Sequence, residues 1–338
     1  MNSPAARKLP CFNPPAESAI NSTHRPITGI LYCVFALLAF AAQDSIIKLL
    51  SGRYSVIEIL MIRLAIVLAL LLTVALAWQG PGILRTRRPR LMFARGVLAF
   101  FAFTTYYIAL STIPLAEAAV VYMTAPLFVT LLSALILRER VGPHRWSAVF
   151  VGFGAVVFML DPGSSLFRIE SAMPLFSALC YALIPIINRH IGLSEHALTM
   201  GIYTTASYFV LMALTSTAIL ALPALATDNA TLQGVFQGWV MLQASDWWLL
   251  LLAGVIFTVA LLCITQAYRI AVVSTVAPFE YVYILWASLI GYLIFADVPG
   301  PRTMIGGVVI VTSGCYIILR ERREPGRTAA ATANTGDS

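Results

Sequence analysis

Residues 56–78 read VIEILMIRLAIVLALLLTVALAW, an apolar run in which only Glu58 and Arg63 carry a charge. An α-helix rises about 1.5 Å per residue, so this run is long enough to cross the roughly 30 Å hydrocarbon core of a bilayer. Over the 338 residues, 59% are hydrophobic and 11% are charged, whereas a soluble domain carries about 25% charged residues. The composition excludes a water-soluble fold and predicts an all-α membrane protein.

Apolar runs separated by polar segments predict ten membrane-spanning helices. They cover roughly residues 27–50, 56–78, 91–111, 115–138, 144–160, 171–190, 197–222, 246–268, 273–295 and 302–320. Short links make neighbouring helices antiparallel. The longest link, residues 222–246, has room for an interfacial helix around residues 235–242.

The basic residues predict the orientation of the spans. An even number of spans puts both polar tails, residues 1–26 and 321–338, on one side of the membrane. With these tails in the cytoplasm, sixteen of the 22 basic residues lie on that side, and only Arg53, Arg168 and Arg302 lie opposite. Because cytoplasmic loops favour Lys and Arg, we expect a bacterial-type inner-membrane protein with cytoplasmic termini. The net charge of +7 then reflects topology, and no nucleic-acid partner is expected.

The chain also resembles itself. A shift of 158 residues superposes spans three to five on spans eight to ten without a gap and places Gly96 on Gly254. A weaker match at an offset of 141 places Phe40 on Tyr181. Similar apolar composition is the simpler explanation and stays open.

Each predicted half, residues 27–160 and residues 171–320, contains five spans. Because five is an odd number, the second half enters the membrane from the opposite side, and the repeat is inverted. Inverted repeats are typical of secondary transporters, which bind their solute near the midplane between the halves. We therefore expect a site built mainly from spans one, three, four, six, eight and nine.

The chain resembles the EamA-type members of the drug/metabolite transporter superfamily over roughly residues 27–320. The resemblance rests on Arg95-Gly96, Ala116 to Pro126, Arg138-Glu139-Arg140, Arg145-Trp146 with Gly152 and Gly154, and Ala277-Pro278 leading to Asp297. Asp297 stands where the second half of the family more often has Glu. The resemblance implies a transporter of small organic solutes.

Three further stretches resemble the S-adenosylmethionine and riboflavin importers of that superfamily. They are Gln43-Asp44 to Lys48 in the first span, Arg63 in the second, and Ala277-Pro278-Phe279-Glu280-Tyr281 in the ninth. The superfamily also exports amino acids and amino-acid-derived metallophores, so the resemblance slightly favours export without settling the direction.

Ionisable residues inside spans are functional candidates, because a charge at the bilayer centre costs at least about 2.5 kcal/mol. Asp44 and Lys48 lie four residues apart, on one face of the first helix. Asp44 either faces the solute or pairs with Lys48, and Lys48 is also close enough to reach the outer interface. Arg63 is expected to pair with Asp44, with Glu58 or with an anionic group of the solute.

Glu280 is predicted to lie well inside the ninth helix, two residues after Pro278 and close to Tyr281 and Tyr283. It is a candidate for binding a cationic group or exchanging a proton, and a structural hydrogen bond to a Tyr or Arg is the alternative. Pro278 and Pro126 are predicted to interrupt their helices, which suits a polar cavity.

The remaining candidates for contact with the solute are Tyr107, Tyr122, Tyr203 and Gln266, together with Tyr281 and Tyr283. Any one of them has packing or the membrane interface as its simpler role. Arg95 is interpreted as a positive-inside residue near the cytoplasmic end of its helix.

Signs of enzymatic chemistry are missing from the sequence. The four histidines fall in tails or loops, and no metalloprotease, serine-hydrolase or P-loop motif is present. Four of the five cysteines lie inside apolar runs, so no disulfide is expected. We therefore predict no catalytic residue, no metal and no cofactor.

The sequence predicts a secondary transporter that moves a small polar or zwitterionic organic metabolite through the lipid bilayer by alternating access. A riboflavin or other vitamin importer of the same fold is the first alternative. A channel and an intramembrane enzyme that modifies a lipid or metabolite are the alternatives of other classes. The substrate, the direction, the coupling ion, with a proton among the possibilities, and the oligomeric state stay open.

Overall fold

A computed structural model describes residues 26–136, 142–161, 169–191, 195, 197–221, 239–271 and 276–323. Its helices are α1 (Pro26–Ser51), α2 (Val56–Gln79), η2 (Pro81–Leu84), α3 (Pro89–Leu110), α4 (Leu115–Tyr122), α5 (Ala125–Ile136), α6 (Pro143–Leu160), α7 (Ile169–Ile191), α8 (Ala197–Ala221), α10 (Ala244–Ile270), η5 (Ala277–Tyr281), α12 (Val282–Phe295) and α13 (Pro301–Arg323). The regular structure of these ranges is helical throughout, which confirms the all-α class.

Length and surface composition identify the bundle as a membrane protein. Within the described residues, nine spans are long and apolar enough to cross a bilayer, and α13 follows them in the chain. Large apolar side chains stand exposed on the outside of the bundle, with Trp78 at 73%, Leu285 at 67% and Leu293 at 70%. An apolar exterior of this kind is suited to lipid tails, so the predicted polytopic membrane fold is confirmed.

Helix boundaries follow local chemistry. The helices α3, α6 and α13 begin at Pro89, Pro143 and Pro301, where a missing N–H costs nothing because the first turn has no intrahelical acceptor for it. Helix α2 ends at Gln79 and is followed by Gly80, whose φ of 70° lies in the left-handed region that favours glycine. Residues 239–243 are not helical, and the rest of the predicted interfacial helix lies outside the described residues.

The fourth predicted span is two helices. Helix α4 ends at Tyr122 and α5 begins at Ala125, so the chain breaks just before Pro126. The Thr124 hydroxyl donates a hydrogen bond of 2.7 Å to the Val121 carbonyl oxygen at this break. A carbonyl loosened from the helix ladder thereby keeps a partner inside the membrane-spanning region.

The ninth predicted span is also interrupted. It starts with the 3₁₀ turn η5 and continues as α12 from Val282. The offset of 158 residues carries Met123 and Thr124, between α4 and α5, onto Tyr281 and Val282, where η5 meets α12. The two halves of the chain therefore interrupt their fourth spans at equivalent positions.

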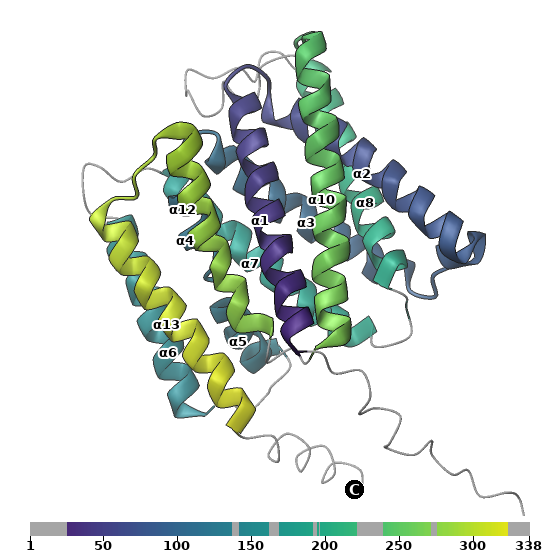
Figure 1. Cartoon of the computed structure of the whole chain (residues 1–338). Coiled ribbons are helices and arrows are strands. Elements are labelled where there is room, and N and C mark those ends of the chain that lie inside the picture. The colour runs from purple at the N-terminus through teal and green to yellow at the C-terminus, as the bar shows by residue number, and fades with distance from the viewer. Residues whose placement is uncertain are drawn as a thin grey trace, which may run out of the picture.

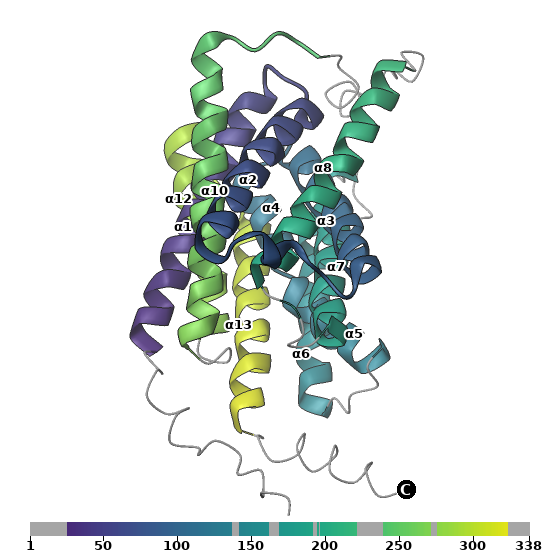
Figure 2. The same cartoon turned by 90° about the vertical axis from the view of Figure 1, so that its right-hand side faces the viewer.

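Helix α1 lies between α10 and α12 on the face toward the viewer, with α13 against α6 on one flank and α2 beside α8 on the other (Figure 1). The helices α1 and α10 pack closely, because a Cβ added to Gly29 would lie 2.5 Å from the Cβ of Ala271. The start of α1 and the end of α13 lie at the same end of the bundle (Figure 2). We call this end the tail end, and the opposite end, where α1 finishes at Ser51, the lock end.

Candidate functional site

A carboxylate on α1 forms the centre of a buried polar cluster. Asp44 is 4% exposed. Its carboxylate accepts hydrogen bonds from the Tyr107 hydroxyl on α3 at 2.8 Å and from the neighbouring Gln43 amide. The Tyr283 hydroxyl on α12 donates to its other oxygen. Charge-assisted hydrogen bonds of this kind hold a carboxylate within an apolar region. We call Gln43, Asp44, Arg63, Tyr107 and Tyr283 the Asp44 cluster.

Arg63 from α2 completes the Asp44 cluster. Its Nη1 donates to Gln43 Oε1 at 2.8 Å and to the Tyr107 hydroxyl at 2.9 Å. The guanidinium also lies over the rings of Tyr107 and Phe257, 4.8 and 4.9 Å from their centroids. Sequence reasoning expected Arg63 to pair with Asp44, Glu58 or the solute. In the structure, Gln43 and Tyr107 are shared partners that connect Arg63 to Asp44.

Every hydrogen-bonding position of the Tyr107 hydroxyl is used. Its proton goes to Asp44, and its oxygen accepts from the Gln43 amide at 2.7 Å and from Arg63 at 2.9 Å. A phenol has one donor and two acceptor positions. Tyr107 is therefore fully paired within the protein and fixes the relative positions of α1, α2 and α3.

A column of tyrosines leads away from the Asp44 cluster. Because Tyr283 gives its proton to Asp44, Tyr106 is the donor in the 2.8 Å contact between the Tyr106 and Tyr283 hydroxyls. The Tyr106 ring lies 5.1 Å from that of Tyr122 on α4, which in turn lies 5.6 Å from that of Tyr181 on α7. Tilted ring contacts at these distances are favourable aromatic pairs.

Glu280 lies apart from the Asp44 cluster, on η5 near the start of the ninth span. Glu280 was expected well inside the ninth helix, with an interruption at Pro278; in the structure both residues lie within the 3₁₀ turn that precedes α12. The half-buried Glu280 side chain accepts a hydrogen bond of 2.5 Å from the Tyr268 hydroxyl on α10. The predicted structural alternative, a hydrogen bond to a tyrosine of another helix, is therefore present.

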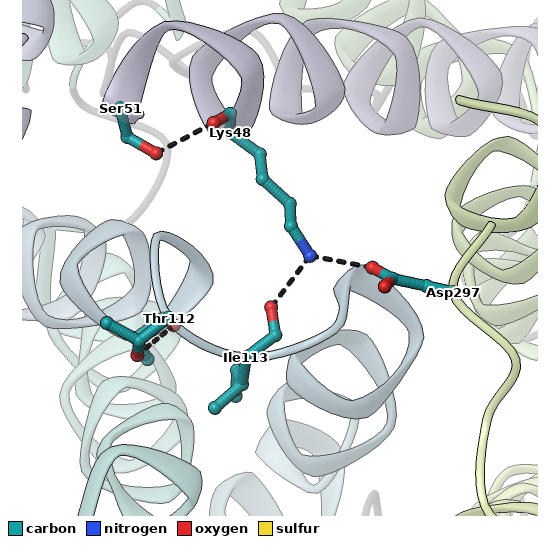
Figure 3. A network of polar contacts seen from close by, with 6 residues as sticks. Lys48, Ser51, Thr112, Ile113 and Asp297 are labelled. Atoms are coloured by element: carbon teal, nitrogen blue, oxygen red, sulfur yellow. Dashed lines mark hydrogen bonds and ion pairs between the residues drawn. The ribbon is translucent and has the colours of Figure 1, made fainter. Parts of the chain in front are cut away.

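The lock end is closed by an ion pair between distant segments. Lys48 Nζ lies 2.8 Å from Asp297 Oδ2 and donates to the carbonyl oxygen of Ile113 at 2.9 Å (Figure 3). The ammonium also lies 4.9 Å from the centroid of the Phe295 ring. Lys48 thus pairs with Asp297 rather than with Asp44, its neighbour on the same helix face. This contact, which we call the lock, joins the end of α1 to the α3–α4 link and to the segment after α12.

Several other candidates lie outside the Asp44 cluster. The Tyr203 hydroxyl donates to the Leu84 carbonyl oxygen at 2.8 Å, next to η2. Tyr281 is buried in a separate apolar group with Val120 and Ile310. Gln266 is half-buried on α10. The structure therefore brings together Asp44, Arg63, Tyr107 and Tyr283, with Tyr122 nearby in the tyrosine column, and leaves the others elsewhere.

Sequence reasoning missed Tyr181 and the role of Asp297 as the partner of Lys48. For Tyr181 a signal existed, since the offset of 141 residues aligns it with Phe40, three residues before Gln43. For Asp297 only its place at a helix end was visible, because a pair separated by 249 residues leaves no local pattern. Among the described residues, no group of three His, Cys, Asp or Glu side chains is arranged to hold a metal ion.

A helical bundle that buries a carboxylate and a guanidinium between its membrane spans has features typical of membrane transport proteins. Residues 27–161 match the EamA-like transporter family. This match confirms, over the first half of the chain, the resemblance to EamA-type transporters seen in its motifs.

Curated relatives cover nearly the whole chain. An S-adenosylmethionine uptake transporter of Rickettsia prowazekii is 27% identical over 88% of this chain and 94% of its own length. A riboflavin transporter of Vibrio cholerae is 29% identical over 90% and 97%, and a pseudopaline exporter of Pseudomonas aeruginosa is 28% identical over 88% and 97%. One solved crystal structure shares the fold, with a TM-score of 0.55 at 19% identity over 89% of this chain and 97% of that chain.

Proposed function

We propose that this chain is a secondary transporter of a small zwitterionic organic metabolite of the S-adenosylmethionine type. The observation that carries the proposal is the Asp44 cluster, in which α1, α2 and α3 of the first half meet α12 of the second half around one buried carboxylate. Charged groups at membrane depth are expensive and are kept where a solute or ion passes. Relatives named as S-adenosylmethionine uptake transporters support this substrate class.

The charges available along the bundle fit a zwitterion. Glu280 supplies a carboxylate for a cationic centre, and arginines on α2 and α3 supply the opposite charge. S-adenosylmethionine carries a sulfonium, an ammonium and a carboxylate on one skeleton, together with an aromatic base. The aromatic faces of Tyr122 and Tyr181 suit that base.

The contacts at the lock end support alternating access. Lys48, Asp297 and the Ile113 carbonyl tie three segments together on the side away from the chain termini. A second contact joins the α1–α2 link to the start of α10, where the Tyr54 hydroxyl donates to Asp246 at 2.7 Å. We assign the tail end to the cytoplasm from the basic residues, so this conformation is closed toward the outside.

Riboflavin is the second candidate solute, because the column of Tyr106, Tyr122 and Tyr181 offers stacking surfaces to a flat ring. Riboflavin has no charged group, so it would leave the buried charges without a role in recognition. The two candidates therefore predict different responses to removal of Glu280.

The proposal is tested by uptake of radiolabelled S-adenosylmethionine into proteoliposomes, with unlabelled riboflavin as competitor. We expect saturable uptake of the unmodified compound, a loss of at least about tenfold in Glu280→Gln, and no such loss in Asp161→Asn, a matched carboxylate at a half-exposed ion pair. Uptake equal to that of empty liposomes would contradict transport of this class. Competition by riboflavin with no effect of Glu280→Gln would favour the second candidate, and release of a chemically altered product would indicate an enzyme.

A further inference from the structure

Arg95 on α3 has buried guanidinium nitrogens without partners. Its Nε and Nη1 are inaccessible and make no hydrogen bond. The residue lies on the same face of α3 as Ala99 and Tyr106, four and eleven residues further on, which are 1% and 4% exposed. An arginine that only reached for the cytoplasmic surface would place these nitrogens in water. The Arg95 side chain therefore points into the bundle, and its Nε and Nη1 can still donate hydrogen bonds to a ligand.

Tyr181 on α7 keeps accessible surface although its neighbours on the same helix face are buried. It lies on the same helix face as Ser177 and Ala178, which are both 0% exposed, yet Tyr181 itself is 37% exposed. Phe176, which is 47% exposed, points away from that face. Tyr181 therefore lies on the inward side of α7, where its ring contacts Phe103 and Tyr122.

Two groups of opposite charge act on Tyr181. It lies within electrostatic range of Arg95 from the first half of the chain and of Glu280 from the second half. Glu280 has Tyr268 as its hydrogen-bond partner, and the buried Oδ1 of Asn188, seven residues after Tyr181 and on the same face of α7, has none. We call Arg95, Tyr181, Tyr268 and Glu280 the Glu280 cluster.

We propose that Arg95 binds the carboxylate of the transported zwitterion while Glu280 binds its cationic centre, with the Tyr181 ring between them. This inference rests on the proposed transport function and specifies how its substrate is recognised. The planar guanidinium matches a carboxylate with two parallel hydrogen bonds, and a buried charge without a partner gains most from such a ligand. Arg63 has one buried nitrogen without a partner, Nε, but its Nη1 already bonds Gln43 and Tyr107 and its guanidinium lies over the Phe257 ring.

The recognised class follows from this geometry. The solute must present a carboxylate toward α3 and a cationic centre toward η5, with the aromatic column beside it. α-Amino-acid derivatives that carry a sulfonium or a second ammonium meet this description. A solute that has only one of the two charges leaves either Arg95 or Glu280 without an opposite charge, and is therefore selected against.

The test compares S-adenosylmethionine with decarboxylated S-adenosylmethionine, which lacks only the carboxylate, in proteoliposomes. The variants are Arg95→Gln, Arg95→Lys and the control Arg90→Gln, whose side chain is exposed near the start of the same helix. We expect wild-type protein to prefer the carboxylated compound in KM by about 10- to 100-fold. Arg95→Gln should abolish this preference by raising KM for S-adenosylmethionine alone, Arg95→Lys should retain part of it, and Arg90→Gln should behave as wild type.

Two results would overturn the inference in distinguishable ways. If wild-type protein transports the probes but Arg95→Gln keeps the preference, or weakens both probes equally with a lower melting temperature, Arg95 has a structural role and the transport function stands. If wild-type protein moves neither probe, the proposed function itself fails. Melting curves in detergent, recorded for every variant, separate loss of folding from loss of recognition.

Discussion

The Asp44 cluster toward the lock end and the Glu280 cluster toward the tail end differ in how completely their polar atoms are paired. In the Asp44 cluster the carboxylate takes three donors and the Tyr107 hydroxyl uses all its positions. One nitrogen of the Asp44 cluster, Arg63 Nε, has no partner, whereas in the Glu280 cluster two nitrogens of Arg95 have none. A polar group that is satisfied by the protein stabilises the fold, whereas a group left unpaired gains by binding a ligand.

The difference assigns separate tasks to the two clusters. Asp44 precedes Lys48 by one helical turn on α1. The Asp44 cluster therefore joins the two halves of the chain next to the lock. The Glu280 cluster lies nearer the tail end, on the side that the lock leaves free. The tyrosine column connects them, so a solute bound at Tyr181 is linked through Tyr122 and Tyr106 to the hydroxyl that bonds Asp44.

The largest loss of stability is expected from Asp44→Asn. The amide keeps the shape of the side chain but removes the charge that balances the buried Arg63, and uncompensated buried charges cost about 3 kcal/mol or more. Thermal unfolding in detergent micelles measures the effect. The matched control, Asp161→Asn at the half-exposed pair with Arg302, should cost less than about 1 kcal/mol. Equal melting temperatures for the two variants would remove the distinction on which the comparison rests.

Breaking the lock should favour a conformation that is open on the outer side. The expected change in free energy is smaller than the loss of stability in Asp44→Asn. The Lys48–Asp297 pair is mostly buried, with side chains 13% and 25% exposed, so we expect Lys48→Met to shift the closed state by about tenfold. The readout is the rate at which an impermeant thiol reagent labels Ala287→Cys, one turn from Tyr283, in a chain whose own cysteines are replaced by serine. In Arg302→Met, which breaks an exposed pair, labelling should rise less than about threefold. Equal labelling in both variants would show that the lock does not hold the outer side closed.

Glu280→Gln is expected to affect transport far more than folding. The Tyr268 hydroxyl can donate to the amide oxygen as it does to the carboxylate, so the free energy of unfolding should change by less than about 1 kcal/mol. Uptake of S-adenosylmethionine should still fall at least about tenfold, because its cationic centre loses its counter-charge. If Glu280→Gln had a melting temperature as low as that of Asp44→Asn and left uptake unchanged, the tasks assigned to the two clusters would be wrong.

The smallest effect is expected from Tyr181→Phe. The ring contacts with Phe103 and Tyr122 persist, and only the hydroxyl is lost. We expect KM for S-adenosylmethionine to change by less than about threefold in this variant and by about tenfold or more in Tyr181→Ala, which removes the stacking surface. If the two variants have the same KM, the ring contributes nothing to recognition.

Sequence alone could predict the spans because each carries its signal locally. The run around Arg63 and the prolines that open α3, α6 and α13 determine the helix positions without reference to distant residues. The buried charges Asp44 and Glu280 were visible for the same reason, since any ionisable residue in an apolar run is conspicuous. The helix interruption before Pro126 followed from the missing N–H of proline.

The partners of these charges could not be predicted, because they come from helices far apart in the chain. Lys48 had a nearby carboxylate in Asp44, yet Asp297 takes its place. Arg95 resembled an ordinary interfacial arginine until its helix face could be compared with that of Ala99. Apolar helices present many equivalent faces to one another, so the pairing of faces depends on packing that one sequence does not reveal.

The position of the bound solute is the most direct test of the account. In a chain without native cysteines, the rate of thiol modification at Tyr181→Cys is measured with and without saturating S-adenosylmethionine, and Gly82→Cys in the exposed η2 turn is the control. The account predicts that the solute slows modification at position 181 at least about tenfold and leaves position 82 unchanged. Equal rates at position 181 with and without a solute that the same protein transports would contradict binding at the Glu280 cluster.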